Sequence, residues 1–289
     1  MQEKGTYLDR IMPSAADLNP EYSSLPDRGQ IKTFREILSD KKNGQSFKIA
    51  DYGIAGIDAI TEGIYEGELI TISGLTKMGK TTLAQSITKN VIKKENTVGW
   101  FTFEVQPARF LEKFQGEEKL LDFGLLPVEH KPGDLKWLFE RIAEMHTTWH
   151  TRIFCIDHLH YLFDIWGSKN TSIAIGQVVR ALKHLTVTIG CTIFLLCHYS
   201  KGQKEENDDS YENIRDSSLI SQESDAVFLV RRLKGADGEY GNEALLTMEF
   251  HRRTGEMKKK VGLVKAGNWL FERSLDKEEN KRKSYGYGQ

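Results

Sequence analysis

Residues 74–81 read Gly-Leu-Thr-Lys-Met-Gly-Lys-Thr, which is a complete G-x-x-x-x-G-K-[ST] phosphate-binding loop. Glycines let the backbone wrap closely around an anion, so that successive N–H groups point at it. The helix that follows such a loop adds the positive end of its dipole. This motif therefore predicts a nucleotide-binding α/β domain in which a strand, the loop and a helix follow one another.

The sequence on either side of the loop supports this prediction over a chance match in a glycine-containing turn. Residues 68–73 form an apolar, β-branched run typical of a buried strand, and residues 80–94 carry apolar side chains at helical spacing. Lys80 would pair with the β- and γ-phosphates, and the Thr81 hydroxyl would ligate Mg²⁺. The residues expected to bind the nucleotide here are Gly74, Leu75, Thr76, Lys77, Met78, Gly79, Lys80, Thr81 and Thr82.

Strand-like and helix-like segments alternate through the rest of the core. Such alternation predicts an α/β fold with a twisted, mostly parallel central sheet and helices on both faces. Carboxy-terminal antiparallel strands are expected after it. The predicted strands are 68–73, 98–103, 151–157, 191–197, 225–231, 244–250, 259–264 and 268–272, and the predicted helices are 80–94, 107–115, 134–148 and 172–188.

The organisation of the chain follows from changes in composition. Residues 1–28 read as a flexible arm, 29–47 as an amphipathic linker helix, 48–274 as the ATPase domain and 275–289 as a charged tail. The apolar face of the linker helix would dock either on its own domain or on a neighbouring subunit.

Composition narrows the class of protein. The formal net charge is −1, so a nucleic-acid partner would have to contact a local basic patch. No apolar run reaches membrane-spanning length and no signal peptide is evident, so we expect a cytoplasmic protein without membrane contact. The three cysteines lie in apolar runs without C-x-x-C spacing, which predicts buried, reduced thiols.

Three further strands end in a polar side chain, and the carboxyl ends of parallel strands meet at one edge of a sheet. Asp157 would hold Mg²⁺ through water. Glu104 would orient and deprotonate the attacking water, or would cap the helix that follows it. His198 would sense the γ-phosphate, although a lone histidine is usually structural.

Other polar groups leave alternatives open. Arg253 is either an arginine finger for a neighbouring subunit or a solvated turn residue. Arg232 could contact the adenine, although a solvated strand end is the simpler interpretation. No matching ligand spacing accompanies His158 and His160, so no metal site is expected there.

Five segments resemble the ATPase domain of DnaB-type replicative helicases. Residues 53–70 are similar to the segment that begins the family's ATPase core, with its G-x-x-x-L-D and G-E-L elements. Phe103-Glu104 resembles the family's S-L-E-M motif. Residues 156–162 resemble I-D-Y-L-Q-L, and residues 214–226 resemble L-R-E-S-G-A-I-E-Q-D-A-D. Residues 250–255 resemble the finger motif K-x-R-x-x-G, with histidine in place of the usual lysine.

The resemblance implies a RecA-like P-loop NTPase core that forms a ring, most often a hexamer, and moves 5′-3′ on single-stranded DNA during replication. ATP and Mg²⁺ would be its cofactors, and a separate primase or loader is a further partner that it suggests. Glu104 would be the catalytic base, and Arg253 the finger. His198, where bacterial DnaB has Gln, places the chain nearer to the Twinkle and phage branch.

DNA contacts are expected from loops that face the centre of such a ring. The residues proposed for this role are Lys169, Asn170, Lys201, Lys204 and Arg215. The acidic segment 205–209 would oppose DNA phosphates. Two alternatives are a RadA- or KaiC-like ATPase that assembles without unwinding DNA, and a module that uses ATP only for assembly. Glu104 argues against the last of these, because binding alone needs no general base.

Overall fold

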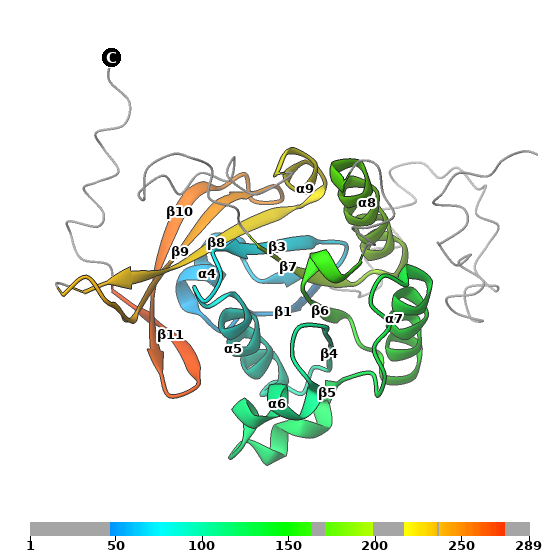
Figure 1. Cartoon of the computed structure of the whole chain (residues 1–289), viewed down its shortest axis with the longest axis horizontal. Helices are drawn as coiled ribbons and strands as arrows, with labels where there is room; N and C mark the ends of the chain where they lie inside the picture. Colours follow the sequence, from blue (N-terminus) through cyan, green and yellow to red (C-terminus); the bar gives the residue numbers. More distant parts are fainter. Residues whose placement is uncertain (1–46, 163–170, 199–216, 236, 275–289) are drawn as a thin grey trace, which may run out of the picture.

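The computed structural model describes residues 47–274 except 163–170, 199–216 and 236 (Figure 1). The arm, nearly all of the linker helix and the tail lie outside these residues, so the predicted domain boundaries stay predictions.

The described chain is built around a nine-stranded sheet with the order β11-β10-β9-β8-β3-β7-β6-β4-β5 (Figure 1). Strands β3, β4, β5, β6, β7 and β8 pair in parallel, and β8 to β11 form an antiparallel extension. The strands are β3 (Leu69–Gly74), β4 (Val98–Thr102), β5 (Gly124–Leu125), β6 (Ile153–Asp157), β7 (Thr192–His198), β8 (Ala226–Lys234), β9 (Tyr240–His251), β10 (Met257–Ala266) and β11 (Trp269–Arg273). A mostly parallel sheet with antiparallel carboxy-terminal strands confirms the predicted fold class.

Helices cover both faces of this sheet. The helices are α4 (Ala55–Thr61), α5 (Lys80–Ile92), α6 (Pro107–Leu111), α7 (Leu135–Trp149), α8 (Thr171–Ile189) and α9 (Ser217–Glu223), with 3-10 turns at Glu112–Phe114, Glu118–Phe123 and Leu159–Leu162. One apolar cluster joins α5 to one face of the sheet, and a second joins α7, α8 and α9 to the other. The predicted helices and strands are thus confirmed, apart from shifts at their ends. The short α4, β5 and α9 were not predicted, nor was the small sheet of β1 (Lys48–Ala50) and β2 (Ile64–Tyr65).

The apolar runs of the sequence form strands of the central sheet, and they are apolar throughout because helices cover both faces of that sheet. Every residue of β3, β4 and β6 is buried. Such strands carry continuous rather than alternating hydrophobicity. Cys155, Cys191 and Cys197 are free and buried, which confirms the prediction of reduced thiols. No helix within the described ranges is long and apolar enough to cross a membrane.

The parallel pairing brings four strand ends to one edge of the sheet. Gly74 of β3 pairs with His198 of β7, and Asp157 of β6 pairs with Thr102 of β4 and with Leu196 of β7. We call this the carboxyl edge. The turn between β9 and β10 lies at the opposite edge, because His251 pairs with Ala226 at the start of β8.

Candidate active site

The phosphate loop has the backbone that its sequence predicts. It leaves β3 at Gly74, and α5 begins at Lys80. Gly74 has a φ of +156°, and a Cβ there would lie 2.3 Å from the carbonyl oxygen of Val230. Gly79, the N-cap of α5, is left-handed with a φ of +102°. Both positions favour glycine on conformational grounds, so the two glycines of the motif shape the turn into the helix.

Lys80 is buried at the centre of the loop. Its Nζ donates to the carbonyl oxygens of Gly74 and Leu75, each at 3.0 Å, and lies 3.3 Å from Nδ1 of His198. Burial lowers the pKa of Lys80, and nearby carboxylates oppose that change. An ammonium with only carbonyl and imidazole acceptors is available to bind a phosphate that enters the loop.

Thr81 and Asp157 meet beside the loop. The Thr81 hydroxyl donates to Oδ2 of Asp157 at 2.8 Å. Burial raises the pKa of Asp157 to about 6, and the hydrogen bond from Thr81 opposes that shift. A hydroxyl and a carboxylate supply the oxygen ligands that Mg²⁺ prefers, so these residues fit the predicted metal role.

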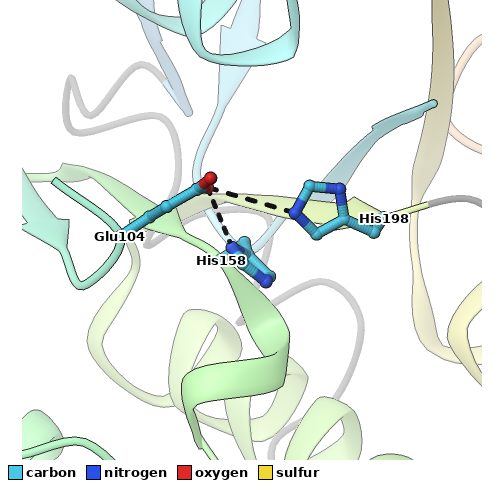
Figure 2. Close-up of side chains that lie close together, drawn as sticks. All are labelled: Glu104, His158 and His198. Carbon is cyan, nitrogen blue, oxygen red and sulfur yellow. Dashed lines mark hydrogen bonds and ion pairs between the residues drawn. The ribbon is translucent and has the colours of Figure 1, made fainter. Parts of the chain in front are cut away.

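Glu104 lies past the end of β4 and points towards two histidines at the carboxyl edge (Figure 2). Its Oε2 is 3.2 Å from Nδ1 of His158 and 4.0 Å from Nε2 of His198. Its side chain is 42% exposed, whereas His158 is buried. The N-cap of α6 is Gln106, so the helix-capping alternative for Glu104 finds no support here.

The histidines have defined protonation patterns. Burial lowers the pKa of His158 to about 3 and that of His198 to about 4, with a smaller contribution from neighbouring charges. Both are therefore neutral near pH 7. Lys80 can only donate, so Nδ1 of His198 accepts and its proton lies on Nε2, facing Glu104. His198 thus contacts Lys80 through Nδ1, while its Nε2 faces Glu104 at 4.0 Å, beyond hydrogen-bond length.

The predicted convergence of Lys80, Glu104, Asp157 and His198 at one edge is present in the structure. Sequence reasoning did not include His158 in this group. The available signal was its position directly after Asp157, at the end of a buried strand. That signal was weak, because its partners come from two other strands.

Arg253 lies in the turn between β9 and β10, at the edge opposite its own phosphate loop. The two edges are one length of β3 apart, roughly 16 Å, so Arg253 cannot reach the phosphates of its own chain. Its Nε donates to Glu68 at 2.8 Å, Nη1 to Glu62 at 3.0 Å, and Nη2 to the carbonyl of Thr61. The guanidinium also lies 3.6 Å from the ring centre of Tyr65.

The assignment of Arg253 as an arginine finger thus stays a prediction. It requires Arg253 to exchange its partners in its own chain for those of a neighbouring subunit.

Arg232 projects from β8 and donates to the carbonyls of Tyr240 and Gly241, at 2.6 Å and 2.8 Å. Its predicted adenine contact is likewise untested. The proposed DNA-binding residues, Lys169, Asn170, Lys201, Lys204 and Arg215, lie outside the described residues.

A phosphate loop after β3, an acid ending β6 and a further acid after β4, on a sheet extended by antiparallel strands, define a P-loop NTPase of the RecA-like class. The profile of the DnaB-like helicase C terminal domain family matches residues 50–126 and 126–269. The chain belongs to this family, whose members are replicative ring helicases that hydrolyse nucleoside triphosphates. The RadA- or KaiC-like alternative is therefore not favoured.

Solved structures show the same fold. One, described as an ATPase domain, matches with a TM-score of 0.69 and 17% identity, over 86% of this chain and 100% of that chain. A DnaB-like replicative helicase, described with its interactions with primase, matches with a TM-score of 0.68 and 16% identity, over 89% of this chain and 72% of that chain. No curated protein sequence matches this chain.

Proposed function

We propose that this chain is an ATP- and Mg²⁺-dependent motor that assembles into a ring and moves on single-stranded DNA. The observation that carries the proposal is the meeting of Lys80, Asp157, Glu104 and His198 at the carboxyl edge. These groups have the residue types that hydrolysis of a phosphoanhydride needs: a cation, a metal ligand, a base and a γ-phosphate contact.

The residues divide the chemistry among themselves. Loop N–H groups and Lys80 bind the phosphates, and Lys80 gives up the carbonyls of Gly74 and Leu75 to do so. Thr81 and Asp157 would hold Mg²⁺, which neutralises phosphate charge when bound. Glu104 takes a proton from the attacking water.

His198 is suited to report the state of the nucleotide. It contacts Lys80 on one ring nitrogen and faces Glu104 with the other. When Lys80 turns to a phosphate, Nδ1 of His198 loses its donor. His198 is the last residue of β7, so its reorientation with the nucleotide would act directly on the segment that follows it. Family resemblance assigns DNA contacts to this segment.

Assembly would complete the site. Arg253 cannot serve its own chain, so a finger role requires a neighbour whose carboxyl edge faces the β9–β10 turn. A hexameric ring provides that arrangement in the family. The likeness to a helicase described with primase also makes a primase a candidate partner, with a separate loader as another.

The test combines three measurements on the full chain. ATPase rate is measured with and without single-stranded DNA, particle mass is measured in parallel by light scattering, and unwinding is measured on forks with a 5′ or a 3′ tail. We expect DNA-stimulated hydrolysis, a ring-sized particle and unwinding from the 5′ tail. Lys80→Ala is the control for contaminating ATPases. Hydrolysis and assembly without unwinding would instead support the RadA- or KaiC-like alternative.

A further inference from the structure

The cluster of Glu104, His158 and His198 has a feature that nucleotide hydrolysis does not require. It places two imidazoles and one carboxylate together (Figure 2). Each residue offers one ligand atom, and these atoms all lie within 4.8 Å of one another. We propose that Glu104, His158 and His198 form a binding site for a divalent transition metal such as Zn²⁺, and that the bound ion inhibits hydrolysis by occupying the catalytic base.

The donor set separates this site from the predicted Mg²⁺ site. Mg²⁺ prefers oxygen ligands, which Thr81 and Asp157 supply. Imidazole nitrogens suit Zn²⁺ and neighbouring transition metals, and three protein ligands plus water is a common arrangement for an accessible Zn²⁺. Mg²⁺ at ordinary concentrations is therefore a poor competitor for the histidine site.

The distances are close to those of a coordinated ion. Ligand atoms around a tetrahedral Zn²⁺ lie about 3.4 Å apart, given metal–ligand bonds of about 2.0–2.1 Å. The pair from Glu104 and His158 is already at 3.2 Å, and the pair from Glu104 and His198 is at 4.0 Å. The largest movement needed is about 1.4 Å. Because both pairs that involve Glu104 are at 4.0 Å or less, this movement falls on the third pair, between His158 and His198.

The histidines are held together without relying on Glu104. Their rings cross nearly at right angles, 82°, with centres 4.2 Å apart. His158 is also packed against Tyr161, with ring centres 4.8 Å apart. Residues that are already ordered lose little conformational freedom when a metal binds.

Two existing contacts must change on metal binding. Nδ1 of His158 now donates to Glu104, so its proton must move to Nε2 before Nδ1 can ligate a metal. A metal on Nε2 of His198 needs the ring proton on Nδ1, where His198 now accepts from Lys80. Lys80 also bonds two backbone carbonyls, so it can release the histidine without losing all its partners. Lys80→Ala should therefore bind the metal at least as tightly as the unchanged chain.

Inhibition of ATP hydrolysis by the bound metal rests on the proposed function, because it requires Glu104 to be the catalytic base. A carboxylate that ligates Zn²⁺ cannot also accept a proton from water. Saturation with Zn²⁺ is then expected to slow ATP hydrolysis roughly 10²-fold or more, within the range for loss of a general base.

The test measures binding separately from activity. Co²⁺ is titrated into the nucleotide-free full chain in Mg²⁺ buffer and followed by its visible absorption, and Zn²⁺ is titrated by calorimetry. We expect one ion per chain, with His158→Gln and His198→Gln weakening binding about tenfold or more. His184→Gln is the matched control, because it removes an exposed imidazole on α8.

The outcomes are separable. Absence of a coordinated Co²⁺ spectrum in the unchanged chain overturns the site, whatever the variants do. Equal affinity in folded His158→Gln, His198→Gln and His184→Gln also overturns it. Metal binding in a chain that does not hydrolyse ATP leaves the site standing and overturns the proposed function. Normal ATP hydrolysis at saturating Zn²⁺ overturns the proposed inhibition but leaves the metal site standing.

Discussion

Arg253→Ala is expected to destabilise the fold, quite apart from any effect on hydrolysis. The guanidinium is the ionic partner of Glu68, whose side chain is only 7% exposed. It also pairs with the exposed Glu62 and stacks on Tyr65. Burial already raises the pKa of Glu68, and Arg253 opposes that shift. Removing Arg253 therefore leaves a buried carboxylate without its cation.

The expected loss in free energy of unfolding follows from the burial of Glu68. Removing one partner of a buried ion pair costs about 3–5 kcal/mol. Arg253 is 28% exposed, so the lower end, about 3 kcal/mol, applies here. For a domain of this size that corresponds to a fall of about 6–12 °C in Tm. The exposed pair with Glu62 adds little.

The assay is thermal unfolding of Arg253→Ala beside Arg252→Ala. Arg252 is the preceding residue and is exposed, and its side chain bonds only to backbone carbonyls of α9 in the described structure. Its removal should change Tm by much less. Adding Glu68→Gln to Arg253→Ala should recover part of the loss, because the unpaired charge is then absent. Equal Tm values for the two arginine variants would refute the ion-pair reasoning.

The finger role has its own readout. At a temperature where Arg253→Ala is folded, it should bind ATP but hydrolyse it roughly 10³–10⁵-fold more slowly. Mixing it with Lys80→Ala should restore activity, because some interfaces then pair an intact loop with an intact finger. A folded variant with full activity would make Arg253 purely structural. Loss of activity that mixing never rescues would argue against a finger shared between exchanging subunits.

Other variants test single contacts. Glu104→Gln should bind ATP and hydrolyse it roughly 10²–10⁴-fold more slowly, and a near-normal rate in a single-turnover assay would place the base elsewhere. Lys80→Ala should abolish nucleotide-dependent activity, and unchanged hydrolysis by the folded variant would remove the phosphate-loop assignment. Gly74→Ala should cost about 2–5 kcal/mol, because its Cβ would meet a carbonyl oxygen at 2.3 Å. Gly67→Ala, at a φ of +79° with nothing within 4 Å, should cost only about 1–2 kcal/mol in chemical unfolding, and equal costs would refute the steric argument.

Much of the fold was predictable because its signals are local. The phosphate loop occupies residues 74–81, and the buried strands are continuous apolar runs between turns. The short elements α4 and β5 were missed because neither is long enough to show a period. The polar ends of β4, β6 and β7 were predicted to meet, since parallel strands bring their carboxyl ends to one edge.

The sequence by itself determined that a phosphate-binding loop, an acid at the end of β6 and an acid after β4 should meet at one edge of the sheet. Only the tertiary structure decided which side chains touch. Glu104, His158 and His198 come from three different strand ends, and their spacing along the chain says nothing about the distance between their ligand atoms. Arg253 and Glu68 are separated by 185 residues, and their contact depends on the pairing of β8 with β9. Strand register and side-chain rotamers set such contacts, and both depend on packing across the whole sheet.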